Sequence, residues 1–559
     1  MKSQSRVSKR GTNGEIRGFR STAQRFLAES YNLFPQAASE LGLHAYDAEL
    51  GPNNPGVYSR YIHLLKTTLN RVEALPDNAF AGDDWLDRRG FLSMLRTDLF
   101  QNDALKRWRN NPQIHCDAAI QSIFGLAVRH SRDLRKIRPA IESRLGKIPE
   151  FLAGGAACLK EPVPLWTKLA IKSCHGVHPF LEELEKKLLP MNSPEKTAEL
   201  SKKTAELFRA ARAAFDSYAR EISRKPAGRK EGFAVGREGF EFLIRERLGL
   251  PYSLPEAEAV GRKLVSRLAA DVKREAARFG RKPAREIIEE AAASWKPSAG
   301  SLLAEYQKKT REVRERFRSA DLLTFPERER LDVMPVPDFL KHLMPTAAYT
   351  QPGPYERKQE GIFWVNDLGA QLADPRKRDA ETRQHFGLEL TCAHEGYPGH
   401  HVQFVIQNRH PSKLRRHFAH GIFYEGWTLW CEKMCIDHGI YQSPVARLMQ
   451  LTDALWRAHR IVIDCGLHSG EMPFPAACRR LVEGVGFTAK RAETEVNWYT
   501  SAPTVPMSYL LGRLELEKLW LVTRRDGWTL KRFNDWILSF GAIPWSWIWQ
   551  SQLATQETA

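Results

Sequence analysis

Apolar residues recur at every third or fourth position along most of the first 345 residues. Leu92, Leu95 and Leu99 show this spacing, which places their side chains on one face of an α-helix. Residues 195–224 are rich in Ala, Lys, Glu and Leu, a composition typical of one long helix. The pattern therefore predicts an N-terminal helical scaffold over residues 22–345.

The pattern changes near residue 345. Residues 346–360 are rich in proline, glycine and tyrosine, which predicts a loop, and the run 361–366 (GIFWVN) follows. So short a run of aromatic and β-branched residues predicts a strand. Helical spacing returns afterwards, so residues 346–559 are predicted as a second, catalytic helical region with a small β element at its start.

One stretch, residues 391–403 (TCAHEGYPGHHVQ), carries the beginning of a metal-binding signature. His394 is followed at once by Glu395, as in the H-E-x-x-H motif of zinc peptidases, but the next histidines come six and seven residues later. On an unbroken helix, His400 would point away from His394, since six steps of about 100° make about 240°. His401 would return to the same face but about 10.5 Å along the axis, too far to share one ion.

The two residues between these histidines allow a different arrangement. The ring of Pro398 collides with the carbonyl of His394 in a regular helix and offers it no N–H, so the helix must open. Gly399 adds backbone freedom beside the break. If both residues loop out, His400 occupies the place of the missing fourth-position histidine. We predict His394 and His400 as ligands, with His401 as the other candidate, and the alternative is a kinked helix whose histidines bind no metal.

A catalytic zinc needs three protein ligands and an open position. Glu425 lies 31 residues after His394, at the start of a helix that an antiparallel pairing brings back across it, and is the predicted third ligand. The alternative is a carboxylate placed there by the helix dipole. Glu432 lies seven residues further on a shared face, where it either orients a ligand imidazole, meets the substrate's amino end or is a surface acid. Glu395 is the predicted general base, which accepts a proton from the attacking water.

Two later stretches offer polar groups to an oxyanion or a substrate. Arg460, Asp464 and His468 lie four residues apart on one stripe of an otherwise apolar helix. A stripe of this kind is either a row of structural ion pairs or part of a site, and the sequence leaves both open. Tyr509 follows a proline-bent segment and enters a helix, so its phenol either reaches the site or packs as a buried aromatic. Tyr509 and His468 are the predicted oxyanion or substrate contacts.

Composition and charge narrow the class of protein. The 559 residues are 42% hydrophobic and 27% charged, values typical of a soluble globular protein. The net charge of +18 is spread along helices and interleaved with glutamates, which favours a solvated basic surface over a specific nucleic-acid partner. No run approaches 18 apolar residues, so a membrane span is not expected.

Eight cysteines without a C-x-x-C pair indicate free thiols in a reducing compartment. Residues 1–21 are polar and basic and lack the apolar core of a secretory signal. They predict a disordered basic tail, with a transit-like segment as the alternative. We therefore expect a cytoplasmic enzyme.

Taken together, these motifs resemble the bacterial domain-of-unknown-function family 885, whose members look like α-helical zinc peptidases of the gluzincin kind. The matching segments, in chain order, are 361–366 (GIFWVN), 394–401 (HEGYPGHH), 425–427 (EGW), 460–468 (RIVIDCGLH) and 508–512 (SYLLG). Members often show E-V-x-R-Y followed by P-G-Q-A-L-x-Y, whereas this chain has EVNWY at 495–499 and PTVPMSY at 503–509. Recognition of the substrate's end therefore stays open.

The resemblance implies a mainly α-helical body akin to carboxypeptidase Taq and the neurolysin-type oligopeptidases, with a deep channel around one Zn²⁺ ion. It also implies that the strand at 361–366 is an edge strand that supports extended peptide, with Asn366 among the candidate substrate contacts. We expect a zinc-dependent hydrolase that cleaves peptide bonds of oligopeptides or carboxy-terminal residues. The alternatives are an amide or ester hydrolase of non-peptide substrates and a catalytically silent, basic helical binding protein. Substrate identity, endo or exo cleavage, native metal and oligomeric state stay open.

Overall fold

The computed structural model describes residues 13–130, 133–189, 195–337, 346–367, 369 and 372–556. Helices dominate these residues and a single small sheet accompanies them, which confirms the mainly α-helical class. Residues 13–21, expected in a disordered tail, form the first turns of α1, and the rest of that predicted tail lies outside the described residues. None of the described helices combines the length and apolar character that crossing a membrane requires.

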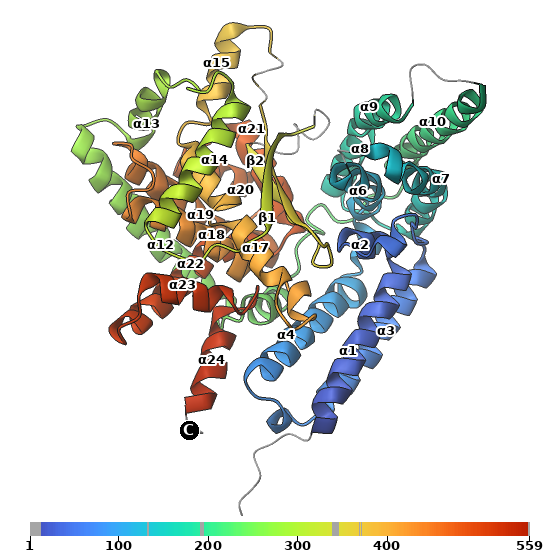
Figure 1. Cartoon of the computed structure of the whole chain (residues 1–559), viewed down its shortest axis with the longest axis horizontal. Helices are drawn as coiled ribbons and strands as arrows, with labels where there is room; N and C mark the ends of the chain where they lie inside the picture. The colour runs from blue at the N-terminus through green and yellow to red at the C-terminus, as the bar shows by residue number, and fades with distance from the viewer. Residues whose placement is uncertain are drawn as a thin grey trace, which may run out of the picture.

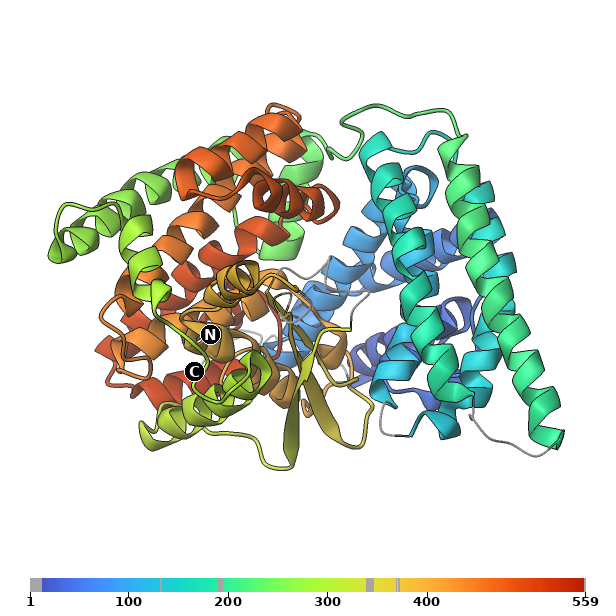
Figure 2. The same ribbon diagram turned by 90° about the horizontal axis from the view of Figure 1, so that it is seen from above.

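The first ten helices lie largely on one side of the molecule (Figures 1 and 2), with α6 to α10 standing apart from the rest in both views. Their bounds are α1 Asn13–Leu33, α2 Pro35–Glu40, α3 Pro55–Glu73, α4 Gly82–Leu99, α5 Arg107–Asn110, α6 Gln113–Arg129, α7 Leu134–Cys158, α8 Pro164–Gly176, α9 His178–Leu188 and α10 Glu195–Ser223. The long helix predicted at 195–224 is α10.

The remaining helices lie largely on the other side of the molecule (Figures 1 and 2). Their bounds are α11 Arg237–Leu243, α12 Leu254–Ala276, α13 Ala284–Ala293, α14 Leu302–Ser319, α15 Pro375–Arg383, α16 Leu388–Thr391, α17 His400–Asn408, α18 Gly421–Asp437, α19 Ala446–Ser469, α20 Phe474–Val485, α21 Ala489–Ser501, α22 Val505–Arg525, α23 Leu530–Leu538 and α24 Trp545–Gln556. α18, α19 and α22 pack on one another at the centre of this side.

The sheet contains the strand that the sequence predicts and two that it does not. Its order is β1 (Glu329–Pro335), β3 (Gln359–Val365) and β2 (Ala347–Thr350), with β1 parallel and β2 antiparallel to β3. The predicted strand is β3, but it is central, not at the edge. Its backbone is paired on both sides, so the expected role of β3 as an edge strand that adds a peptide is wrong.

The largest apolar core joins the two ends of the chain. It contains Phe91 from α4, Trp427 from α18, Leu510 from α22 and Ile548 from α24. A second core lies among α6 to α10 and reaches β3 through Trp364. The sheet thus takes β1 from the predicted scaffold region and β2 and β3 from the predicted catalytic region, and the boundary between those regions stays a prediction.

Candidate metal centre

The helix that carries the metal motif opens where the sequence predicts. α16 continues as a single π-helical turn, η8 (Cys392–Gly396), and α17 begins only at His400. A Cβ added to Gly399 would lie 1.8 Å from the His394 carbonyl oxygen, so only glycine lets the chain fold back this closely. Trp427 of α18 donates its indole N–H to the Pro398 carbonyl over 2.9 Å. The break therefore brings the start of α17 back against His394.

This fold brings the three predicted ligands together. His394, His400 and Glu425 each offer one ligand atom, and these atoms all lie within 4.8 Å of one another. Glu425 Oε2 is 3.7 Å from His394 Nε2 and 3.6 Å from His400 Nε2. Ligands about 2.0–2.2 Å from a tetrahedral zinc stand about 3.3 Å apart. The observed separations thus come within a few tenths of an ångström of those a bound ion requires.

The Glu425 carboxylate has an oxygen that the protein does not satisfy. Glu425 is 7% exposed, and within the described part of the chain its Oε2 atom receives no hydrogen bond. Leaving a buried carboxylate oxygen unpaired is costly unless a cation meets it. The same oxygen is the one that faces both imidazoles, so the three groups fit a divalent cation between them.

Glu432 orients the first imidazole. His394 Nδ1 donates to Glu432 Oε1 over 2.8 Å, which leaves Nε2 directed at Glu425. A carboxylate behind a ligand imidazole fixes its orientation and raises its basicity. Burial lowers the pKa of His394, but the nearby carboxylates of Glu425 and Glu432 outweigh it and raise that pKa to about 10. Burial lowers the pKa of His400 to about 4, so its imidazole is neutral at pH 7.

Aromatic side chains enclose His400. Its ring stacks on Tyr349 at 6.1 Å between centroids and also contacts Phe404 and Tyr424. The ring Nδ1 has no hydrogen-bond partner among the described residues, in contrast to that of His394. Stacking, rather than a second carboxylate, therefore holds this imidazole in place.

Two further groups at the centre have chemistry suited to proton transfer. Burial raises the pKa of the Glu395 carboxyl to about 7, with His394 opposing and Glu425 adding to the rise. The ring of Tyr509 stacks on His394 at 6.3 Å between centroids. Burial, and then the Glu425 carboxylate, raise the pKa of this phenol well above its ordinary value, so it stays protonated. Glu395 can thus exchange a proton near pH 7, while Tyr509 can only donate a hydrogen bond.

A close crossing of α18 and α22 places Glu425 beside Tyr509. A Cβ on Gly426 would lie 2.6 Å from the backbone of Gly512, and one on Gly512 would lie 2.2 Å from the carbonyl oxygen of Ile422. Backbones this near to each other require glycine on both helices. This contact accounts for the glycines in the EGW and SYLLG segments.

His401, the other candidate ligand, is engaged elsewhere. Its Nε2 lies 2.6 Å from Glu329 Oε2 of β1 and its Nδ1 lies 3.0 Å from the Tyr349 hydroxyl of β2. A Cβ on Gly361 of β3 would meet both the Tyr349 hydroxyl and His401 Nδ1 at 2.5–2.6 Å. Sequence reasoning missed Glu329 and Tyr349. The one available signal was a glycine inside a strand pattern, which often marks a close approach.

The predicted polar stripe on α19 braces other helices. Arg460 bonds to the Tyr499 hydroxyl and Glu495 and lies 4.6 Å from the Tyr509 ring centre. Asp464 accepts hydrogen bonds from the backbone N–H groups of Thr504 and Met507, which begin α22. The stripe thus supports the helix that carries Tyr509.

His468, the last member of that stripe, contacts α21 and α11. Its Nε2 lies 3.0 Å from the Tyr499 carbonyl oxygen, and its ring stacks on Phe240. The predicted oxyanion role of His468 therefore stays a prediction. Asn366 follows β3, is fully buried, and donates its backbone N–H to the Thr346 carbonyl, and its role as a substrate contact stays a prediction.

Two surface cavities, of about 840 and 620 Å³, lie elsewhere on the molecule. The first is lined by residues that include Arg328, Glu356 and Arg416, and the second by residues that include Lys106 and Glu231. Neither is lined by the three clustered ligands. The deep channel implied by the family resemblance therefore stays a prediction.

Two solved structures share this fold. One is described as "a putative lipoprotein of unknown function from Shewanella oneidensis", with a TM-score of 0.74, 18% identity, and coverage of 96% of this chain and 99% of that one. The other is "the putative lipoprotein from Colwellia psychrerythraea", with a TM-score of 0.77, 18% identity, and coverage of 98% and 100%. No curated protein matches the chain.

These similarities correct one expectation and leave another without support. Both similar structures are described as lipoproteins, which contradicts the predicted cytoplasmic location, and that prediction is withdrawn as wrong. Neither description names a peptidase, so the relation to gluzincin peptidases is not supported by these likenesses. The family model described as "Bacterial protein of unknown function (DUF885)" matches residues 35–550, nearly the whole chain. The chain therefore belongs to the DUF885 family, as its motifs indicate.

Proposed function

We propose that this protein is a metal-dependent hydrolase in which His394, His400 and Glu425 hold one zinc ion. The observation that carries the proposal is the unsatisfied, buried Glu425 oxygen 3.6–3.7 Å from both imidazole Nε2 atoms. Two histidines and one glutamate are a donor set of catalytic zinc sites, which keep one position open. When bound there, zinc acts as a Lewis acid that polarises a carbonyl and makes water a nucleophile near neutral pH.

The chain's own groups supply the proton transfers. Glu395, with a pKa of about 7, accepts the proton of the attacking water and delivers it to the leaving group. The Tyr509 phenol, kept protonated by burial, donates a hydrogen bond to the oxygen that gains charge. Glu432 holds the His394 ring so that Nε2 faces the reaction centre. Each group thus has one role that its surroundings permit.

The proposed substrates are peptides, either oligopeptides or the carboxy-terminal residues of longer chains. This part rests on the likeness of the 394–401 segment to the H-E-x-x-H motif of zinc peptidases. Activity against a peptide library, compared with panels of non-peptide esters and amides, separates the two substrate classes. Mass spectrometry of the peptide products distinguishes cleavage inside the chain from trimming at its end.

Metal content is the first test. We expect about one equivalent of zinc at this centre, lost in His394→Ala and in His400→Ala. His401→Ala should retain it, because both ring nitrogens of His401 bond to Glu329 and Tyr349. His63→Ala, at an exposed position of α3, is the control for handling. Loss of zinc from His401→Ala alone would refute the ligand set.

Catalysis is tested separately from binding. Glu395→Gln should keep the ion and lower kcat by about 10²–10⁴-fold, because the amide accepts no proton. Tyr509→Phe should lower kcat while metal content stays unchanged, since one donor to the oxyanion is removed. If Glu395→Gln hydrolyses substrate as fast as the wild type does, Glu395 is not the base.

A further inference from the structure

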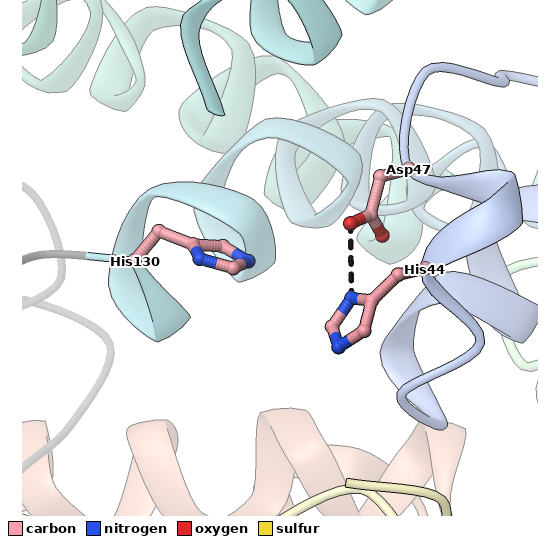
Figure 3. Close-up of side chains that lie close together, drawn as sticks. All are labelled: His44, Asp47 and His130. Carbon is pink, nitrogen blue, oxygen red and sulfur yellow. Dashed lines mark hydrogen bonds and ion pairs between the residues drawn. The ribbon is translucent and has the colours of Figure 1, made fainter. Parts of the chain in front are cut away.

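A second cluster of potential ligands lies far along the chain from the first. His44 belongs to the one-turn helix η1 (His44–Tyr46), Asp47 follows it, and His130 follows the end of α6. Each offers one ligand atom, and these three atoms lie within 4.8 Å of one another. Figure 3 shows the His130 ring directed from the end of α6 toward the Asp47–His44 pair.

His44 is held between two carboxylates. Its Nδ1 lies 3.0 Å from Asp47 Oδ2, and its Nε2 lies 3.2 Å from Glu356 Oε2. A neutral imidazole has only one N–H, so one of these carboxylates then faces a lone pair. A positive charge must accompany this arrangement, either a second proton on the ring or a cation beside it. If Nε2–H donates to Glu356, the Nδ1 lone pair and Asp47 Oδ2 face each other across 3.0 Å, and a cation beside them is needed to offset their repulsion.

The surroundings hold these groups where a cation would need them. Asp47 is 8% exposed, and the hydroxyl of buried Ser39 donates to its other oxygen over 2.6 Å. Arg129 donates to the Ser39 carbonyl over 2.7 Å, which fixes the end of α6 next to His130. The Arg129 guanidinium lies near the carboxylates of Glu40, Glu356 and Asp47, and the Arg144 guanidinium also lies near Asp47 and Glu40.

Glu356 lies in the connection between β2 and β3. The backbone of this connection packs against Leu41 and Gly42, just before His44 in the chain. The Tyr355 N–H donates to the Leu41 carbonyl over 2.9 Å. A Cβ on Gly42, whose φ is +89°, would lie 2.8 Å from the Glu356 nitrogen. A carboxylate behind a ligand histidine is the usual second layer of a metal site, because it fixes the tautomer and the ring orientation. Glu356 occupies that position behind His44.

The positive charge beside His44 is either a second proton on its ring or a metal ion, and His130 distinguishes between the two. A neutral imidazole carries one lone pair, which the His130 ring can offer to a metal ion. Its ring lies 6.0 Å from that of His44 between centroids. A protonated His44 gains nothing from that lone pair, whereas a metal ion binds it directly. The His44 side chain is 49% exposed, so an ion can reach it from solvent.

We propose that His44, Asp47 and His130 form a second site for a divalent transition-metal ion such as zinc, with Glu356 orienting His44. Two imidazoles and one carboxylate suit zinc and other first-row metals better than calcium or magnesium. The ion would tie η1 and the end of α6 to the β2–β3 connection. β2 also carries Tyr349, which stacks on His400, so the second ion would brace one wall of the first centre.

The test is zinc stoichiometry in four proteins, measured by elemental analysis after reconstitution and gel filtration without free metal. We expect two equivalents in the wild type, one in His44→Ala, one in His400→Ala and none in the double variant. His44 is the variant of choice because its half-exposed side chain can be removed with little effect on folding, which circular dichroism checks. His63→Ala is the matched control, an exposed histidine that should keep two equivalents.

The outcomes separate the two sites. One equivalent in the wild type that disappears in His400→Ala and persists in His44→Ala overturns the second site and leaves the first. One equivalent that disappears only in His44→Ala does the reverse. Cobalt(II) reconstitution of His400→Ala gives an independent reading, because its visible spectrum should show ligand-field bands that are absent from the double variant. If the double variant shows the same ligand-field bands, the proposal is also overturned.

Discussion

Replacing Gly399 with alanine tests whether the break in the metal helix builds the first centre. The added Cβ would stand 1.8 Å from the His394 carbonyl oxygen and 2.4 Å from that of Ala393. Side-chain Cβ atoms essentially never approach closer than 3.0 Å, so this contact must open by about 1.2 Å. Both neighbours are backbone atoms, one of them in a proposed ligand residue. The strain therefore moves His394 away from His400.

A shift of this size matters because metal–ligand distances tolerate only about 0.2 Å. We expect Gly399→Ala to weaken zinc binding by at least about 10–100-fold, or about 1.4–2.8 kcal/mol. The unfolding free energy should fall by about 1–3 kcal/mol, the usual cost of overpacking. Competition with a chromophoric chelator measures the zinc affinity, and chemical denaturation measures the stability.

Gly396→Ala is the matched control in the same segment. Its Cβ would meet Leu331 Cδ2 at 3.0 Å, Thr310 Cγ2 at 3.5 Å and Phe363 Cδ1 at 4.0 Å, all side-chain atoms, and the nearest is the end of a flexible side chain. We expect its zinc affinity to stay within a few-fold of the wild type. If Gly399→Ala binds zinc as tightly as Gly396→Ala does, the break is not what places the ligands, and the reasoning fails.

Three further predictions concern protons and packing. The pKa of metal-free His394 is raised to about 10, so zinc binding at pH 7 should release about one proton. Calorimetry in buffers of different ionisation enthalpy measures this release, and a binding enthalpy that does not depend on the buffer would contradict the prediction. Glu395 must be ionised to act as base, and its pKa is about 7 without metal, so kcat/KM should fall as the pH drops below about 7. A cation beside the carboxylate moves this fall to lower pH. A kcat/KM that rises as the pH drops would exclude Glu395 as the base. In Gly512→Ala the new Cβ would meet the Ile422 carbonyl at 2.2 Å, which should lower the unfolding free energy by about 1–3 kcal/mol. An unchanged denaturation midpoint would argue against the close crossing of α18 and α22.

The sequence predicts local features of the site well, because they follow from local chemistry. Pro398 and Gly399 forbid a regular helix, so the interruption before His400 is readable from backbone sterics alone. Spacing along α18 likewise predicts that Glu425 and Glu432 share a face, and Glu432 does bond to His394. Those inferences needed only distances along one element.

Features that depend on distant segments were not predictable in the same way. β2 has only four residues, and β1 begins with three charged residues among its first four and ends in a proline, so neither shows the apolar pattern of a strand. The spacing of Arg460, Asp464 and His468 shows that they share a face but not that α21 and α22 cover it. His44 and Asp47 are close in the sequence, but His130 lies 83 residues after Asp47, and Glu356 lies further still along the chain. Nothing in the sequence therefore indicated that these residues form a cluster.

The most direct test of the account is an anomalous diffraction experiment at the zinc edge on crystals of the reconstituted protein. We predict a peak about 2.0–2.2 Å from Nε2 of His394, Nε2 of His400 and Oε2 of Glu425. A map with no peak among these three atoms, from crystals whose protein contains zinc, would contradict the central claim.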